Sequence, residues 1–186
     1  PFYKIQHYPG MPETLKELKK RGVKLGVCSN KPHEAAVKVV ERMFGSQIFD
    51  AVMGQSDSVR KKPAPDGPLK IAEQFGIKPE ECMYLGDSGT DMQTGKAAGM
   101  YTVGVLWGYR EKEELLKNGA DYLVDSPEDI LDLYEEKWRS IVRSNYFNQK
   151  WRNLIQQLAL RFNKAPQVIG HGDAFHPNFL VHTGPI

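Results

Sequence analysis

The amino-acid sequence predicts an α/β protein with a doubly wound, Rossmann-like parallel sheet, helices on both of its faces and a helical C-terminal extension. Two observations carry this prediction. Short apolar, β-prone runs alternate with amphipathic helical patterns through the first 134 of the 186 residues. The strand-like runs are almost continuously apolar, which is typical of parallel strands that helices cover on both faces.

Five helices are expected before residue 120. In the first, Leu15 and Leu18 lie at helical spacing behind Pro12, a residue that suits the first turn of a helix. A glycine stands close after the end of each helix, and glycine favours the position just beyond a helix C-terminus. These helices are expected at residues 12–21, 32–44, 68–75, 91–98 and 111–117.

Five strands are expected between and after these helices. They are the apolar runs at residues 23–28, 49–53, 82–85, 101–106 and 122–124. Cys28 and Cys82 each lie inside one of these runs, so we expect two buried, reduced thiols. Residues 126–129, Ser-Pro-Glu-Asp, resemble a helix-start box and predict one more helix.

The charge balance changes after Tyr134. Residues 135–186 hold seven Lys or Arg against three Asp or Glu, and they show two amphipathic helical stretches before a strand-like run at residue 168. We therefore divide the chain into a core at residues 1–134 and a helical extension at residues 135–186.

Composition excludes several function classes. The net charge is +2 and no Lys/Arg run is longer than three residues, so a nucleic-acid partner is not expected. No long apolar segment or signal-peptide pattern is present, so we expect a soluble, cytoplasmic protein that does not bind membranes. The oligomeric state stays open.

Polar residues gather in three loops, and in an open parallel sheet ligands bind beyond the carboxyl ends of the strands. Ser29 and Asn30 precede a helix, whose free N–H groups can hold an anion. Residues 60–65, Arg-Lys-Lys-Pro-Ala-Pro, place cations that can neutralise phosphate in a proline-stiffened loop. Residues 86–91, Gly-Asp-Ser-Gly-Thr-Asp, present two carboxylates after a strand, a pattern that suits Mg²⁺. A helix cap, a solvated charged loop and turn chemistry are the respective alternatives.

Taken together and in this order, the loops resemble the haloacid dehalogenase superfamily of phosphatases, specifically its phosphoglycolate phosphatase-like branch. The resemblance covers about residues 5–134. The matching segments are residues 8–15, which resemble the return to the core after a helical cap, and residues 27–32, 62–65 and 86–91, which resemble the second, third and fourth family motifs.

The resemblance implies a Mg²⁺-dependent hydrolase that acts on a small phosphorylated metabolite. Ser29 would hydrogen-bond the transferring phosphoryl group with help from the Asn30 backbone, and Lys62 would stabilise negative charge. Asp87 would be a Mg²⁺ ligand, and Asp91 would support the metal shell or Lys62. These are positioning and electrostatic roles, which is what phosphoryl transfer mainly requires.

One part of the family pattern has no match. The family reaction begins with a nucleophilic aspartate in a DxDGT-like segment after the first strand, and nothing before Ser29 fits this pattern. The resemblance therefore implies a phosphatase core that lacks its nucleophile, first strand and cap, and we expect this chain to be inactive alone. An empty central slot would leave the strands that end at Cys28 and Leu85 without a partner on one side.

A second resemblance lies near the C-terminus. Residues 168–181 resemble the catalytic loop of the aminoglycoside and choline phosphotransferase family, within a match that covers about residues 148–181. By that resemblance Asp173 would accept a substrate proton and Asn178 would bind Mg²⁺, with His171 completing the pattern. No Gly-rich loop or phosphate-pairing Lys precedes it in kinase fashion, so a complete kinase site is not expected.

Three functions therefore stay open from the sequence: a phosphomonoesterase, a remnant of a small-molecule kinase, and a non-catalytic fragment. A further hypothesis joins the two resemblances. The strand at residues 167–170 could occupy the empty central slot of the sheet and bring Asp173 close to Lys62 and Asp87.

Overall fold

The computed structural model describes residues 6–146, 167–173 and 176–177. Helices are α1 (Met11–Lys20), α2 (His33–Phe44), α3 (Asp66–Phe75), α4 (Gly89–Ala97), α5 (Lys112–Lys117) and α6 (Asp129–Tyr146), with a 3₁₀ turn at Pro79–Glu81. Strands are β1 (Lys24–Pro32), β2 (Ala51–Gln55), β3 (Met83–Gly86), β4 (Tyr101–Val105), β5 (Tyr122–Val124), β6 (Gln167–Asp173) and β7 (His176–Pro177). Every helix and strand that the sequence predicts before residue 134 is present, with ends that shift by a few residues.

The strands form one sheet in the order β2-β1-β6-β3-β4-β5. All neighbours along this path are parallel, and β7 pairs with β6 in antiparallel fashion. The connections between the strands before residue 125 run through helices. The predicted α/β class with a parallel sheet is thus confirmed.

The central slot of the sheet is filled by a strand from the C-terminal part of the chain. β6 lies between β1 and β3, with Cys28 opposite His171 and Leu85 opposite Gly170. The strands that end at Cys28 and Leu85 therefore have partners on both sides, as the hypothesis for residues 167–170 anticipates. Filling the slot satisfies two rows of backbone N–H and C=O groups that would otherwise lie unpaired inside the protein.

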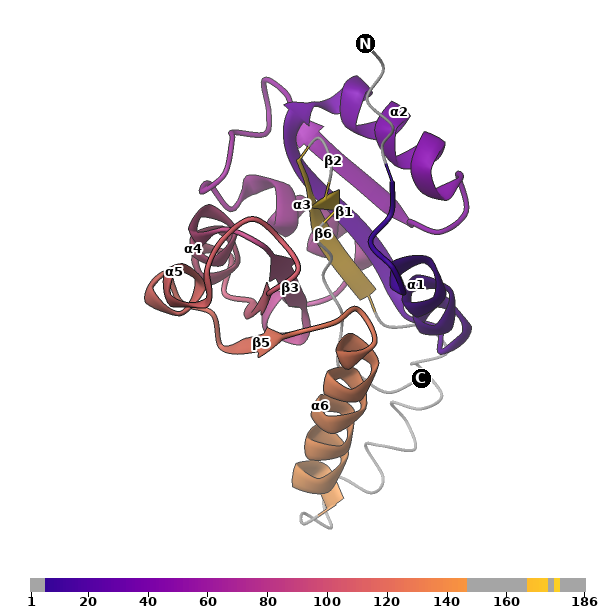
Figure 1. Cartoon of the computed structure of the whole chain (residues 1–186), viewed down its shortest axis with the longest axis vertical. Coiled ribbons are helices and arrows are strands. Elements are labelled where there is room, and N and C mark those ends of the chain that lie inside the picture. The colour runs from indigo at the N-terminus through magenta and orange to yellow at the C-terminus, as the bar shows by residue number, and fades with distance from the viewer. Residues whose placement is uncertain (1–5, 147–166, 174–175, 178–186) are drawn as a thin grey trace.

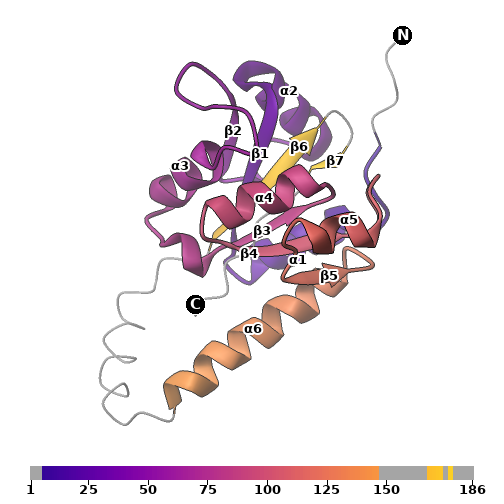
Figure 2. The same cartoon turned by 90° about the vertical axis from the view of Figure 1, so that its left-hand side faces the viewer.

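Helices cover both faces of this sheet. Figure 1 shows α1 and α2 on one side of the strands and α4 and α5 on the other. Figure 2 shows α4 lying across β3 and β4, and the structure records close packing of α4 on both strands. In sheets of this kind ligands bind beyond the carboxyl ends of the strands, so a site is expected at that edge.

Helix α6 crosses the boundary that the charge balance predicts. It continues from Asp129 to Tyr146 without a break at residue 134. The Asp129 carboxylate accepts hydrogen bonds from the backbone N–H groups of Asp125 and Ser126 at 3.0 and 2.8 Å, which fixes the start of the helix. The second amphipathic stretch lies mostly within residues 147–166, outside the described residues. The division into two parts stays a prediction.

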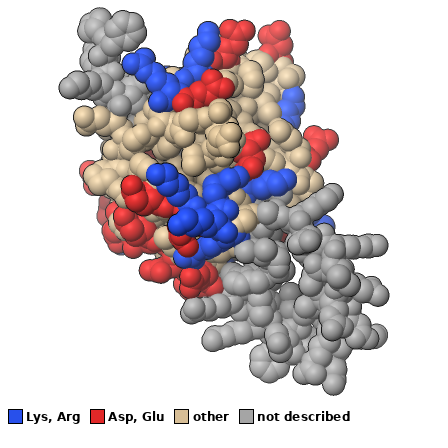
Figure 3. Space-filling view, turned by 90° about the vertical axis from the view of Figure 1, so that its right-hand side faces the viewer, with Lys and Arg blue, Asp and Glu red and all other residues tan. Residues whose placement is uncertain are grey.

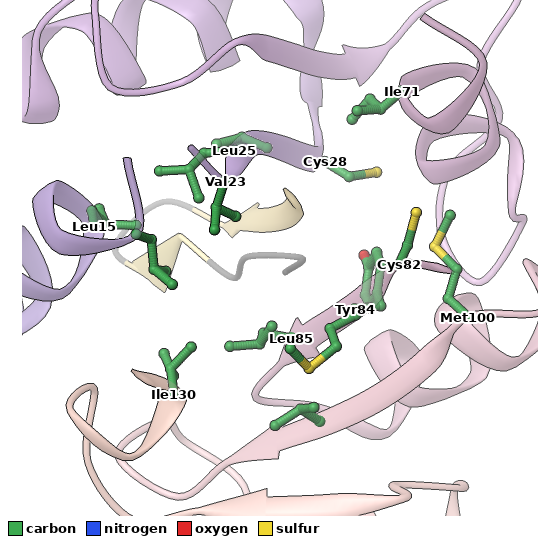
Figure 4. Close-up of a cluster of buried hydrophobic side chains, with 14 of the residues drawn as sticks. Leu15, Val23, Leu25, Cys28, Ile71, Cys82, Tyr84, Leu85, Met100 and Ile130 are labelled. Atoms are coloured by element: carbon green, nitrogen blue, oxygen red, sulfur yellow. The ribbon is translucent and has the colours of Figure 1, made fainter. Parts of the chain in front are cut away.

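The apolar core lies between the sheet and the helices on its two faces. Figure 4 shows Leu15 of α1, Leu25 of β1, Leu85 of β3 and Ile130 of α6 directed towards a common interior. All four side chains are at most 1% exposed. The core also contains both cysteines, which are free and buried as the sequence predicts. Burying such side chains contributes roughly 25 cal/mol for each Å² removed from water.

The charged surface on the α1 side is balanced. Figure 3 shows Lys and Arg side chains gathered on this face with Asp and Glu side chains beside them. Lys19 pairs with Asp50 at 2.8 Å, and Arg21 pairs with Glu17 at 3.1 Å and with Glu135 at 2.8 Å. The basic run at residues 19–21 is therefore a solvated, paired surface. Among the described residues, no helix is both long and apolar enough to cross a membrane.

Candidate functional site

The carboxyl ends of β1 and β3 bring the first and third polar loops to the same edge of the sheet. Ser29 and Asn30 lie within β1, which extends two residues beyond Asn30 before α2 begins. Asp87 and Ser88 follow β3, and Asp91 lies in the first turn of α4. The second loop, at residues 60–65, reaches the same edge through contacts with both of the others.

Ser29 is a buried hydroxyl in the first loop. Ser29 is only 4% exposed, and its Oγ atom accepts a hydrogen bond of 3.1 Å from the backbone N–H of Lys31. This bond fixes the hydroxyl at the turn between β1 and α2. A hydroxyl group can both accept and donate hydrogen bonds, which is the chemistry that binding a phosphate oxygen requires.

Asn30 holds the second loop against the first. Its Oδ1 atom accepts a hydrogen bond of 2.7 Å from the backbone N–H of Lys62. From the sequence, the Asn30 backbone is expected to assist phosphate binding, and its side chain has no expected task. In the structure the side chain anchors the backbone of Lys62, 32 residues further along the chain.

Lys62 and Asp91 form an ion pair inside the protein. The Lys62 Nζ atom lies 2.9 Å from Oδ1 of Asp91, and the side chains are 3% and 0% exposed. A buried charge is costly unless it is paired, so each group depends on the other. Of the two roles that the resemblance leaves open for Asp91, this contact favours the support of Lys62.

The second carboxylate oxygen of Asp91 is also engaged. Ser88 donates its hydroxyl proton to Oδ2 of Asp91 at 2.6 Å. Burial raises the pKa of Asp91, and the opposing influences are the Lys62 ammonium and the hydrogen bond from Ser88. Both oxygens of Asp91 therefore have protein partners, and its structural task is to hold Lys62 and Ser88 in place.

Asp87 lies close enough for its charge to act on both Asp91 and Tyr8. The residue is 7% exposed. Burial, followed by the negative charge of Asp87, raises the pKa of the Tyr8 phenol. The rings of Tyr8 and Trp107 meet edge to face with centroids 6.4 Å apart, and Gly108 approaches Asp87 from the segment after β4. Tyr8 and Trp107 thus bound the side of the site next to Asp87.

Two contributions to the site are absent from the sequence analysis. The Glu114 carboxylate in α5 accepts a hydrogen bond of 3.1 Å from the backbone N–H of Gly89, which tethers the third loop. The other contribution is the segment at residues 107–109, Trp-Gly-Tyr. Its position directly after an apolar strand is a signal that could have drawn attention to it, because strand ends carry ligand sites in such folds.

The donor set at Asp87 fits Mg²⁺. The described residues contain no group of three or more His, Cys, Asp or Glu side chains that could hold a metal ion. Mg²⁺ binds through one or two carboxylates, retains several waters and takes further oxygens from substrate phosphate. Asp87 offers such a carboxylate, and the two oxygens of Asp91 accept hydrogen bonds from Lys62 and Ser88.

The kinase-like residues are only partly within the described chain. His171 and Asp173 belong to β6, with Asp173 as its last residue. Asn178 lies outside the described residues. The structure therefore places the Asp173 position at the carboxyl edge of the sheet but does not test the kinase-like roles.

A comparison with protein families identifies the core. The model of the haloacid dehalogenase-like hydrolase family matches residues 3–99, which include Ser29, Lys62, Asp87 and Asp91. The chain belongs to the haloacid dehalogenase-like hydrolases. This membership agrees with the parallel sheet and with the order of the three loops.

Curated relatives of this haloacid dehalogenase-like chain include two bacterial phosphoglycolate phosphatases. The protein from Escherichia coli K12 is 36% identical over 124 residues, which is 67% of this chain and 49% of the relative. The protein from Aquifex aeolicus is 36% identical over 128 residues, which is 69% of this chain and 59% of the relative. The chain thus spans about half the length of the curated relatives that it matches.

Solved structures show the same haloacid dehalogenase-like fold. A crystal structure assigned as a phosphoglycolate phosphatase from Lactobacillus delbrueckii subsp. bulgaricus is 38% identical and superposes with a TM-score of 0.64. That match covers 67% of this chain and 52% of the solved one. The similarity in sequence and fold supports an alignment of the three loops with those of phosphatases.

Proposed function

We propose that this chain carries the phosphate- and Mg²⁺-binding part of a haloacid dehalogenase-type phosphomonoesterase that acts on small, phosphoglycolate-like metabolites. The observation that carries this proposal is the buried Lys62–Asp91 ion pair beside Ser29 and Asp87 at the carboxyl edge of the sheet. A lysine that is fixed in a low-dielectric site stabilises negative charge more strongly than a solvated lysine does.

Each residue has a task that follows from its contacts. Ser29 would donate its hydroxyl proton to a phosphoryl oxygen, and the N–H groups at the start of α2 add positive potential there. Lys62, which Asn30 and Asp91 hold in place, would neutralise charge on the phosphoryl group. Asp87 would hold Mg²⁺, which supplies charge neutralisation at the phosphate when it is bound.

The organic part of the substrate would contact the aromatic wall at Tyr8 and Trp107. This wall borders Asp87, so it would lie next to a phosphate group that is bound near Asp87. A small acidic metabolite needs little apolar contact, which agrees with the modest size of this wall. In the family a cap selects the substrate, so the choice within this class does not follow from the three loops.

The reaction also needs a nucleophile. In the family this is an aspartate in a DxDGT-like segment, and the first aspartate in this sequence is Asp50. The three loops supply charge stabilisation and a metal ligand, so the 186 residues by themselves are expected to bind phosphate and Mg²⁺ with little turnover.

Phosphate binding tests the proposal directly. We expect inorganic phosphate, titrated into ¹⁵N-labelled protein, to shift the NMR signals of Ser29 and of the backbone around Lys62. Lys62→Ala should weaken this binding, and Lys61→Ala is the matched control because Lys61 lies in the same loop and is exposed. Equal losses in the two variants would mean that phosphate responds only to the charge of the loop, and would contradict the proposal.

Mg²⁺ binding tests the metal ligand. Asp87→Asn removes the charge and keeps the size of the side chain, so it should weaken Mg²⁺ binding measured by calorimetry. An identical response in wild type and variant would remove Asp87 from the site. Saturable binding of ATP that depends on Asp173 would instead favour the kinase remnant, and an absence of phosphate, Mg²⁺ and nucleotide binding would favour a non-catalytic fragment.

A further inference from the structure

The segment that follows β4 approaches Asp87 so closely that only glycine fits at position 108. A Cβ atom built on Gly108 would lie 2.2 Å from Cβ of Asp87 and 2.7 Å from its Oδ2 atom. Carbon atoms that are not bonded pack at about 3.5–4.0 Å, so a methyl group here would overlap with Asp87. The overlap falls on Cβ, which is attached to the backbone, and a rotation of the carboxylate alone would not relieve it.

The glycine is not required by backbone conformation. The described glycines with positive φ are Gly10, Gly22, Gly45, Gly76, Gly99 and Gly119, and Gly108 is not among them. Residues with a side chain can adopt a negative φ without the penalty that makes glycine necessary elsewhere. The need for glycine at position 108 therefore comes from the space beside Asp87.

The residues directly before Gly108 are fixed in place by their contacts. The backbone N–H of Leu106 donates a hydrogen bond of 2.9 Å to the carbonyl of Val124 in β5. Trp107 packs against the apolar core and meets Tyr8 edge to face. Position 108 is therefore held near Asp87 by the residues on its N-terminal side.

We propose that Gly108 is a positioning residue for the metal-binding carboxylate, because its close backbone contact restricts the orientation of Asp87. This inference rests on the proposed function, in which Asp87 binds Mg²⁺. When a single carboxylate holds the ion, the direction of that carboxylate decides the affinity, and groups that orient a ligand typically contribute 10- to 100-fold. Gly108 would act by contact and needs no polar side chain.

Gly108→Ala tests the inference by Mg²⁺ titration calorimetry. We expect Mg²⁺ affinity to fall about tenfold or more. Phosphate binding measured without Mg²⁺ should stay unchanged, because the three atoms nearest to a Cβ at position 108 all belong to Asp87 and none to Ser29 or Lys62. Both measurements are made on protein whose fold is verified by NMR in the presence of a chelator.

Gly104→Ala is the matched control. A Cβ atom on Gly104 would meet Leu123 at 2.7 Å and Leu115 at 3.0 Å, so it adds a methyl group to a crowded site in β4 whose nearest atoms are leucine side chains and not Asp87. It should lower the melting temperature and leave Mg²⁺ affinity unchanged. An equal loss of Mg²⁺ affinity in Gly104→Ala and Gly108→Ala would mean that crowding alone is responsible, and would overturn the inference.

Asp87→Asn separates the inference from the proposed function. If Asp87→Asn leaves Mg²⁺ binding intact, the metal assignment fails. If Asp87→Asn abolishes binding and Gly108→Ala has no effect, the metal assignment stands and the positioning role fails.

A double variant keeps the test decisive if Gly108→Ala does not fold. Asp87→Gly removes the atoms that the new methyl group would meet, so Gly108→Ala combined with Asp87→Gly should regain the melting temperature of Asp87→Gly alone. Failure to regain it would show that the contact with Asp87 is not what requires glycine at position 108.

Discussion

The Nζ atom of Lys62 lies 2.9 Å from Oδ1 of Asp91, and both side chains are almost completely shielded from solvent. The two residues come from different loops, and Asn30 and Ser88 fix the loops on either side of the pair. A lysine in such a setting has few conformations open to it. The ammonium group of Lys62 is consequently held in one position, and a phosphate site needs a positive charge at a fixed position.

Removal of the lysine should destabilise the protein strongly. Lys62→Met leaves the Asp91 carboxylate buried without its cation, and the loss of one partner from a buried pair costs about 3–5 kcal/mol. The free energy of unfolding from urea denaturation measures this effect. Lys61→Met, at an exposed position of the same loop, should change it by less than about 0.5 kcal/mol.

A second substitution shows whether the cost comes from Asp91. Lys62→Met combined with Asp91→Leu removes both charges, so it should recover part of the stability that Lys62→Met loses. Strict additivity of the two single losses would mean that the residues do not interact energetically, despite their distance.

The three loops could be found from the sequence because their chemistry resides in residue types and short spacings. Residues 86–91 present two carboxylates after an apolar run, whatever the rest of the fold does. The contact between Lys62 and Asp91 is different, because 29 residues separate them. Residue spacing does not indicate which side chains meet across loops. The contact was therefore suggested only by the family resemblance, as one of two roles for Asp91.

In the sheet, too, local features could be predicted from the sequence and contacts between distant segments could not. The apolar runs of β1 and β3 predict buried strands, but they do not say which strand lies between them. β6 follows β3 by more than 80 residues, so its place depends on a non-local pairing that could only be raised as one hypothesis. The charge change at Tyr134 does not coincide with the end of a helix, because α6 continues through it. Net charge describes solubility and partners rather than helix ends.

The two thiols predict an alkaline limit to stability. Burial raises the pKa of Cys28 to about 11 and also raises the pKa of Cys82. An unfolded cysteine ionises near pH 8.5, so between about pH 9 and pH 11 the folded protein binds more protons than the unfolded one. The contribution to stability is complete below that window and is lost as the pH rises through it.

The free energy of unfolding should therefore fall between pH 9 and pH 11, by at most about 1.4 kcal/mol per pH unit for each thiol. Cys28→Ala should make the fall less steep. Both thiols should also resist a thiol reagent at pH 8 until the protein is denatured. Rapid labelling of native protein at both positions would contradict the burial of the thiols.

The loop that carries Lys62 should depend on Asp66. The Asp66 carboxylate accepts hydrogen bonds from the backbone N–H and the guanidinium of Arg60, at 2.7 to 3.0 Å, and so joins the start of the loop to the first turn of α3. Arg60 holds the pKa of Asp66 below its usual range. Asp66→Ala should weaken phosphate binding less than Lys62→Ala does, because Asp66 acts only through the loop.

Hydrogen exchange provides the readout for this prediction. The amide of Arg60 should exchange faster in Asp66→Ala, while the amide of Lys62 stays protected by Asn30. Protonation of Asp66 should have the same effect as the substitution, so the protection of the Arg60 amide, relative to its intrinsic exchange rate, should be lost only at a pH well below 4. If exchange at the Arg60 amide is the same in Asp66→Ala and in the wild type, the contact between Arg60 and Asp66 does not hold the loop.

The register of β6 predicts where a nucleophile would have to stand. Cys28 lies opposite His171 and Leu85 lies opposite Gly170. Continued beyond these pairs, the same register would carry Ser29 and Asp87 to the level of Gly172. Successive strand positions belong to opposite faces of a sheet. If the extended backbone continues in this register, position 172 falls on the same face as positions 29 and 87. We therefore expect position 172, one residue before Asp173, to be the place for a nucleophile.

The wild-type chain should accordingly show almost no Mg²⁺-dependent hydrolysis of p-nitrophenyl phosphate. Gly172→Asp places a carboxylate level with Ser29 and Asp87, so it should create measurable turnover through a covalent intermediate. Ala174→Asp in addition supplies a proton donor two residues further along, and general acid catalysis should raise the rate about 100-fold or more. The activity should disappear when Asp87→Asn is added, because the metal ligand is then lost. Hydrolysis by the wild-type chain that Asp173→Asn abolishes would show instead that Asp173 itself reaches the phosphate, and that the strand register does not decide the position of the nucleophile.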